Sequence, residues 1–206
     1  MIDRSAPDAP LPTGPEHVCW AETLLHSRRT TLPKRLRGPG PDAAQQAQIL
    51  RAAAAAPDHG QLLPWRFIEV PEARRSALAA AFAQALHERD PLATAEERQQ
   101  AGDKAFRSPW LLLAVCAVRG GDPEVPAQER LLSAGCALQN MLLMATAMGF
   151  GSALTSGKAM QSAALRTLFA LGADEDALCF LNVGQVIEPR RPRPRPSPET
   201  YFSRLG

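Results

Sequence analysis

A long helix predicted from Ala127 to Met148 constrains the fold most, because it is apolar nearly all round. A helix of this kind belongs at the centre of a hydrophobic core. The stretch from Leu131 to Phe150 could also be weighed as a membrane span, but Gln139 and Asn140 lie at its centre and no aromatic belt flanks it. We therefore expect a central core helix, whose small side chains from Ser133 to Ala137 let another backbone or a flat ring come close.

The remaining pattern predicts a helix-rich α+β domain in which helices separate the strands. Trp110 to Val118 is a short apolar run, typical of a strand buried on both faces, and further strands are predicted over residues 65–70 and 178–183. The other helices are predicted over residues 16–27, 41–54, 72–88, 93–105 and 162–170. The spacing in the first helix predicts that five apolar side chains point inward: Val18, Trp20, Ala21, Leu24 and Leu25.

The length of 206 residues, of which 45% are hydrophobic, suits one domain with a sizeable core. Residues 1–15 contain four prolines and are expected to form a flexible N-terminal arm. Residues 16–188 are expected to form the folded domain, and residues 189–206 an extended C-terminal tail.

The formal net charge of +2 gives no strong attraction to nucleic acid or to a membrane surface, so neither partner is expected. Four cysteines lie far apart among apolar neighbours, without zinc-ligand spacing, so no metal site is expected: Cys19, Cys116, Cys136 and Cys179. Buried free thiols in a reducing cytoplasm are the simplest interpretation. The N-terminus also lacks the apolar core of a signal peptide, and we expect a cytoplasmic protein.

The motif most informative about function runs from Leu50 to Phe67. An alanine-rich helix is stopped by Pro57, a short polar loop follows, and a Pro64-Trp65 pair opens a strand. The segment resembles the Ala-Pro-Ser-x-x-Asn-x-Gln-Pro-Trp signature of the nitroreductase family of flavin enzymes. Its Ala-Pro-Asp-His form resembles a small-subunit branch of that family.

The resemblance implies that this loop lies beside a bound FMN, with Ala55, His59 and Gln61 as cofactor contacts. The chain departs from the signature at Gln61 and Leu63, where the family has Asn and Gln. His59 is the candidate catalytic residue, since an imidazole can hydrogen-bond the cofactor or relay a proton. The alternative is a surface histidine without a task. Asp58 is expected to shape the turn.

A basic segment follows the first helix, and its Arg28-Arg29-Thr30 triplet combines two guanidiniums with a hydroxyl. Forked donors of this kind suit a phosphate dianion such as the one at the end of FMN. The triplet resembles the Arg-Arg-Ser phosphate contact of the nitroreductases, and Arg35 matches the next basic position after a short insertion. An Arg-Arg pair alone is more often a solvated loop, but its spacing from the Ala-Pro loop favours the phosphate site.

The long helix is predicted to end at Gly149-Phe150-Gly151-Ser152, where the chain turns. The following residues resemble the segment that runs along the flavin in nitroreductases, and Leu154, Thr155 and Ser156 match its contact positions. Backbone amides reach a ring edge only where side chains leave room, which explains glycines here. The GxG pattern is not a dinucleotide fingerprint, because it closes a helix and GxGxxG is absent.

The arginine- and proline-rich tail from Glu188 to Pro198 has three interpretations. It is a disordered end, a nucleic-acid binder, or a segment that wraps the partner subunit and lends an arginine to the FMN phosphate, as C-terminal segments do in nitroreductases. The second is the weakest, because only the tail is basic. The third, with Arg193 as the candidate, and the first stay open.

The resemblance extends from the first helix to Gly184 and implies a nitroreductase-like fold, with a central, mostly antiparallel sheet surrounded by helices. It also implies a homodimer that binds FMN at the subunit interface. The implied reaction is ping-pong, NAD(P)H-dependent reduction of nitroaromatics, quinones or similar flat electrophilic acceptors. Two alternatives remain: a same-fold flavoenzyme with dehalogenase or flavin-fragmenting activity, and a non-catalytic flavin-binding or regulatory protein. NADH and NADPH also remain alternatives as the electron donor.

Overall fold

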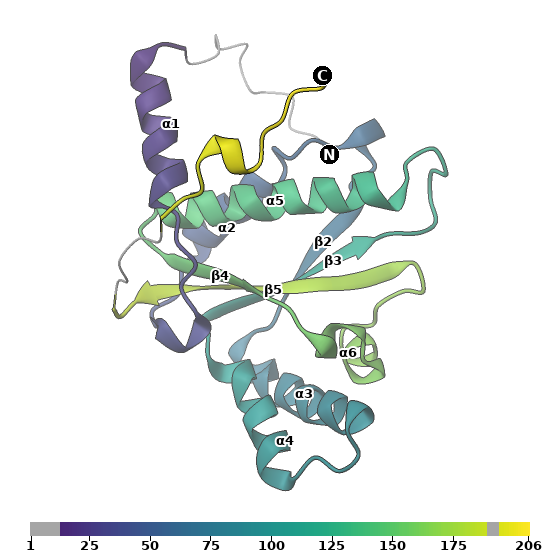
Figure 1. Cartoon of the computed structure of the whole chain (residues 1–206). Coiled ribbons are helices and arrows are strands. Elements are labelled where there is room, and N and C mark those ends of the chain that lie inside the picture. The colour runs from purple at the N-terminus through teal and green to yellow at the C-terminus, as the bar shows by residue number, and fades with distance from the viewer. Residues whose placement is uncertain (1–12, 189–193) are drawn as a thin grey trace.

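The computed structural model describes residues 13–188 and 194–206, and within them five strands form one antiparallel sheet (Figure 1). The strand order is β1-β5-β3-β2, and β4 pairs with β5. The strands are β1 (Leu36–Arg37), β2 (Trp65–Glu69), β3 (Trp110–Ala117), β4 (Gly151–Thr155) and β5 (Glu175–Val186). The expected antiparallel sheet is therefore confirmed, with β5 as the strand that three others contact.

Helices cover both faces of the sheet (Figure 1). They are α1 (Pro15–Ser27), α2 (Ala43–Ala53), α3 (Arg75–Arg89), α4 (Ala95–Gly102), α5 (Ala127–Ala147) and α6 (Ala163–Leu168). Short 3-10 helices span Pro33–Arg35, His59–Gln61, Glu72–Arg74, Asp103–Phe106, Lys158–Gln161 and Pro198–Thr200. Helices α2 and α5 lie on one face, and α3, α4 and α6 lie on the other, while α1 projects away from the sheet.

Strand β3 carries the core on both sides, as its apolar run predicts. Trp110, Leu112 and Ala114 pack in the cluster beneath α2 and α5. Leu111 and Leu113 pack in the cluster that faces α3 and α6. Successive side chains of a strand point to opposite faces, so an uninterrupted apolar run serves both clusters.

Local signals fix where the helices begin. Asp42 caps α2 with a capping box, in which its carboxylate accepts from the Gln45 backbone amide over 2.9 Å. Thr94 and Glu97 form the same reciprocal arrangement at the start of α4. Both devices satisfy backbone amides that a helix start leaves without a partner.

Several expectations about single elements are wrong. Strand β4 occupies Gly151–Thr155, where only a turn and a contact segment were expected, and β1 was not expected at all. Strand β5 also extends beyond residues 178–183 at both ends. Both short strands form because β5 offers them a partner, through pairings such as Gly151 with Gly184 and Leu36 with Val186. Such tertiary pairing leaves little local signal in a glycine-containing segment.

The prediction that α1 turns an apolar face inward is also wrong for a single chain. No α1 residue is buried, and Val18, Trp20 and Leu25 are 58%, 65% and 52% exposed, respectively. The periodicity identified an apolar face of α1 but could not say what covers it.

Two of the four cysteines expected to be buried, Cys19 and Cys136, are exposed, and all four thiols are free. Within residues 13–188 and 194–206, none of the helices combines the length and the hydrophobicity that a membrane span requires.

Candidate active site

The larger candidate cavity lies against β4 and β5 and is bordered by α3 and α4. Its volume is about 880 Å³, within the range of small-molecule sites. Five cationic side chains line it, Lys34, Arg89, Lys104, Arg107 and Lys158, against the two carboxylates of Asp90 and Glu97. The surplus of positive charge favours a ligand that carries negative charge.

Two of the expected contact residues line this cavity: Thr155, the last residue of β4, and Ser156, which follows it. The hydroxyl of Thr155 accepts a hydrogen bond of 3.0 Å from Nδ2 of Asn182, which is 3% exposed and also lines the cavity. Next to them, a Cβ added at Gly157 would meet no atom within 4 Å, so the backbone there faces open space. Leu154, the third expected contact, is 41% exposed and does not line the cavity.

The expected phosphate-binding triplet sits just after α1, and a tail arginine joins it. Nη2 of Arg195 donates a hydrogen bond of 3.0 Å to the carbonyl of Arg28. Burial, together with the charges of Arg195 and Arg29, lowers the pKa of Arg28 below its ordinary value. Arg29 bends back to donate to the carbonyls of His26 and Arg28, so it caps the end of α1. Concentrated positive charge of this kind is stabilised by an anion.

Thr30 connects the arginines to β4 through a parallel bridge with Ser152, and the Thr31 amide donates to the Ser152 carbonyl over 2.9 Å. The Ser152 hydroxyl is buried and has no hydrogen-bond partner among the described residues. Arg35 is half-buried and does not line the cavity; its neighbour Lys34 does. The arginines and the open backbone at Gly157 fit a planar cofactor that ends in a phosphate.

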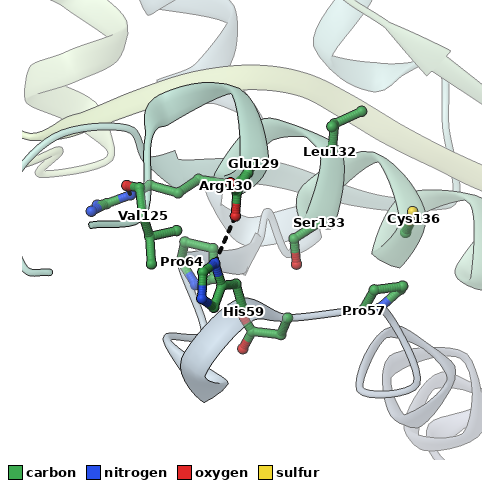
Figure 2. A pocket seen from close by; sticks show the side chains of 10 residues that line it. Pro57, His59, Pro64, Val125, Glu129, Arg130, Leu132, Ser133 and Cys136 are labelled. Atoms are coloured by element: carbon green, nitrogen blue, oxygen red, sulfur yellow. Dashed lines mark hydrogen bonds and ion pairs between the residues drawn. The ribbon is translucent and has the colours of Figure 1, made fainter. Parts of the chain in front are cut away.

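A second, smaller cavity of about 200 Å³ lies between the loop after α2 and the N-terminal half of α5 (Figure 2). Nδ1 of His59 lies 2.8 Å from Oε2 of Glu129, which is in the first turn of α5. The hydrogen bond to Glu129, and then its charge, raises the pKa of His59 above the ordinary 6.5. Cys136 and Leu132 also line this cavity.

The His59 loop holds an unusual backbone conformation. Gly60, Gln61 and Leu63 have φ angles of 64°, 55° and 47°, in the left-handed region that favours glycine. For a residue other than glycine this conformation costs roughly 1–2 kcal/mol. The carboxylate of Asp58 accepts from the Leu63 amide over 2.7 Å, which confirms that Asp58 shapes the turn. Strain of this kind is often found at functional sites, which makes the loop a candidate.

Two groups of predicted residues line separate cavities in one chain, while Arg28, Arg29 and Thr30 line neither cavity. Thr155 and Ser156 line the larger cavity and His59 the smaller one, and no residue lines both. Ala55 and Gln61 are exposed and line neither cavity. Arg193 lies outside the described residues.

The residues of these sites that were not anticipated include Lys34, Glu129, Lys158 and Arg195. Lys34 and Lys158 adjoin segments that the sequence did single out, and Arg195 belongs to the same Arg-Pro tail as Arg193. Glu129 carries no local signal, because 70 positions separate it from His59. No group of three or more His, Cys, Asp or Glu side chains in the described ranges is placed to hold a metal ion.

Comparison with known proteins agrees with this architecture. The model of the Nitroreductase family matches residues 25–185. A protein of Haemophilus influenzae called "Putative NAD(P)H nitroreductase" is 33% identical over 168 residues, which cover 82% of this chain and 89% of that protein. The Escherichia coli K12 protein YdjA, given the same description, is 34% identical over 164 residues, or 78% of this chain and 85% of YdjA.

Two solved structures show the same fold. A nitroreductase-like family protein from Bacillus cereus superposes with a TM-score of 0.75 at 17% identity, covering 89% of this chain and 95% of that one. The FMN- and NADPH-dependent nitroreductase NfnB of Sphigopyxis sp. strain HMH gives 0.69 at 22% identity, covering 90% and 99%. The resemblance is therefore confirmed at the level of the family, and the chain belongs to the nitroreductase family of oxidoreductases.

Proposed function

We propose that this protein is an FMN-dependent NAD(P)H oxidoreductase that reduces flat electrophilic acceptors such as nitroaromatics and quinones. The observation that carries the proposal is the connected path from the Arg28 cluster, through the Thr30–Ser152 bridge, to the cavity wall at Thr155. That path offers charge for a phosphate at one end and open backbone for a flat ring at the other. The family membership and the FMN- and NADPH-dependent neighbour NfnB support it.

The residues have separate tasks in this proposal. Arg28 and Arg195 bind the phosphate. Thr155 and Ser156 present their backbone to the ring, with Thr155 held in place by Asn182. Bound FMN would supply the redox chemistry, accepting a hydride from the nicotinamide and passing electrons to the acceptor. We also keep the narrower assignment to the branch with the Ala-Pro-Asp-His motif, because His59 follows Asp58 in this loop.

The site is proposed to be completed by a second copy of the chain. Helix α1 exposes Trp20, and α5 exposes Leu131 and Leu132, with 65%, 42% and 69% of their surfaces accessible. A Cβ added at Gly135 of α5 would meet no atom within 4 Å, so another helix has room to approach. Apolar exposure on this scale is typical of surfaces that associate. The His59 cavity opens on the same helix, since Leu132 and Cys136 line it.

A homodimer formed through this face would bring the His59 loop of one chain to the cofactor held by the other. This arrangement explains why the two groups of predicted residues occupy separate cavities in one chain. His59 would then donate a proton to the acceptor as it is reduced, a task for which an imidazole with a raised pKa is suited.

Anaerobic stopped-flow measurements on the FMN-loaded protein test the proposed activity. We expect NADPH or NADH to bleach the flavin absorbance, and a quinone or nitroaromatic to restore it in a separate step. Double-reciprocal plots at several donor concentrations should be parallel, as substituted-enzyme cycles give. A flavin that binds but is not bleached by either nicotinamide would favour the non-catalytic flavin-binding alternative. Cleavage of the acceptor or loss of the flavin during turnover would favour a dehalogenase or flavin-fragmenting enzyme.

We keep two further expectations as proposals. Residues 16–188 form the folded unit, with an arm before it and a tail after it, consistent with a family match that ends at residue 185. The protein is proposed to work in a reducing cytoplasm, which the four free thiols support.

A further inference from the structure

Glu129 is the only side chain among the described residues that hydrogen-bonds the imidazole of His59 (Figure 2). Its Oε2 lies 2.8 Å from Nδ1, a distance typical of a charge-assisted hydrogen bond. The two residues come from separate elements, the loop after α2 and the first turn of α5. Their contact therefore depends on how the loop is placed against the helix.

Arg130, the next residue of α5, fixes the start of this helix. It is 4% exposed, and its guanidinium donates to four backbone carbonyls, those of Val125, Ala117, Arg119 and Asp122, over 2.7 to 3.3 Å. These bonds join the end of β3 to the first turn of α5. Glu129 therefore lies on a helix start that Arg130 anchors, whereas its own side chain is 47% exposed and, within the described ranges, hydrogen-bonds His59 alone.

We propose that Glu129 is a positioning residue: it holds the proton on Nδ1 of His59 and leaves Nε2 to face the reacting partner. A carboxylate that accepts from Nδ1–H selects the form of the ring in which Nδ1 is protonated. Nε2 has no hydrogen-bond partner within the part of the chain that the structure describes. This assignment rests on the proposed function, because it deepens the role of His59 in reducing the acceptor.

The surroundings of His59 also favour its charged form. Besides Glu129, the carboxylates of Asp122, in the loop before α5, and Asp58, in the histidine's own loop, act in the same direction, and slight burial opposes them. The one cation that lines this cavity, Arg130, is committed to the backbone carbonyls. A raised pKa keeps more of the imidazole protonated near neutral pH, as a proton donor requires.

Nitrogen-detected NMR of the imidazole ring tests the placement directly, in the FMN-loaded protein labelled at histidine. In the wild-type protein we expect neutral His59 to carry its proton on Nδ1 and to titrate above the ordinary histidine range. Glu129→Gln should lower the pKa of His59 and release the preference for Nδ1. Glu88→Gln removes an exposed carboxylate from α3 and serves as the charge-matched control, which should change neither.

Kinetics provide the second readout. For Glu129→Gln, the rate of the acceptor half-reaction should begin to fall at a lower pH than in the wild-type enzyme, while flavin reduction by the nicotinamide stays unchanged. At neutral pH the loss should be smaller than the ~10²-fold loss expected for His59→Ala, which removes the acid itself. Glu129→Asp, which keeps the carboxylate, should recover part of the shift.

The outcomes separate a failure of the positioning role of Glu129 from a failure of the proposed function. An unchanged His59 pKa and tautomer in Glu129→Gln would overturn the positioning role, even if the enzyme is active. A shifted pKa with an unshifted kinetic profile would likewise overturn it, by showing that His59 is not the donor. If neither nicotinamide reduces the protein, the proposed function fails; the NMR result then still decides whether Glu129 holds His59, and the catalytic assignment is withdrawn.

Discussion

Arg195 donates a hydrogen bond of 3.0 Å to the backbone carbonyl of Arg28, although 167 positions separate the two residues. The described part of the tail therefore returns to the end of α1 in the same chain. Burial, and then the nearby charges of Arg195 and Arg29, lower the pKa of Arg28. Like charges gathered in this way repel one another until an anion binds between them.

Replacing Arg28 should weaken FMN binding. We expect Arg28→Ala to cost roughly 1.5–3 kcal/mol of binding free energy, the scale for losing a charged hydrogen bond. Titration of the apoprotein, followed by quenching of flavin fluorescence, measures the change. Arg74→Ala, which removes an exposed arginine beside α3, is the matched control and should bind FMN like the wild type. Equal affinities for the wild-type and Arg28→Ala proteins would show that Arg28 belongs to a solvated basic loop and does not bind FMN.

Replacing Arg195 tests the role of the tail separately. Arg195→Ala should also weaken FMN binding, by less than Arg28→Ala, because Arg195 is more exposed and exposed charges are better screened. The effect should shrink as salt is raised. An FMN affinity that is independent of Arg195 at low salt would leave the tail no part in the cofactor site.

A charge placed on the apolar face of α5 should disrupt the dimer. Leu132 is 69% exposed and lines the His59 cavity, so Leu132→Glu should shift the protein to monomers and reduce FMN binding with it. Light scattering after size-exclusion chromatography measures the mass. Leu92→Glu is the control, since Leu92 is 91% exposed and lies outside α1 and α5. A Leu132→Glu protein that stays dimeric would place the interface elsewhere.

Arg130 should contribute strongly to stability. Arg130→Leu leaves four carbonyls without their donor, and we expect the free energy of unfolding to fall by at least roughly 1.5–3 kcal/mol. Urea denaturation followed by circular dichroism measures it. Arg119→Ala, which breaks an exposed ion pair with Asp176, should cost only about 0–1 kcal/mol. Comparable losses for the two variants would contradict the structural role given to Arg130.

The Arg66–Glu175 ion pair should make stability depend on acid pH. Two hydrogen bonds of 2.6 and 2.8 Å from Arg66 hold the pKa of Glu175 at about 2, below the ordinary 4.5. The pKa of Glu175 is lower in the folded protein than in the unfolded chain. The ion pair therefore contributes to the free energy of unfolding above pH 4.5, and this contribution is lost as the pH falls toward 2. Glu175→Gln should therefore be less stable than the wild type at pH 7, with the difference shrinking below pH 4.5. A difference that does not change with pH would exclude the ion pair as its cause.

The sequence predicted well those elements whose pattern reflects burial within one chain. The both-face burial of β3 and the extent of α5 follow from the apolar runs at Trp110–Val118 and Ala127–Met148. Strand β4 was missed because Gly151 and Ser152 have little intrinsic preference for a strand, and only pairing with β5 makes them one. For α1, the apolar stripe led to the prediction of an inward face, but Trp20 is exposed. Periodicity marks an apolar helix face and does not tell whether the chain's own core or a partner covers it.

The candidate site also contains residues that a local motif marks and contacts that only tertiary packing creates. Arg28, Thr155 and His59 could be named as candidates from the sequence because short motifs carry them. The Glu129–His59 hydrogen bond could not be predicted, since it joins residues 70 positions apart through the packing of a loop on a helix. The left-handed backbone at Leu63 was equally hidden, because a leucine gives no sign of such a conformation.

Native mass spectrometry of the purified protein tests most directly the central claim that two chains share their flavins. We predict a dimer that carries one FMN per chain, and that releases FMN when Leu132→Glu separates the subunits. An FMN-loaded monomer would contradict the shared site. A protein that neither retains FMN on purification nor binds it when added would contradict the whole account.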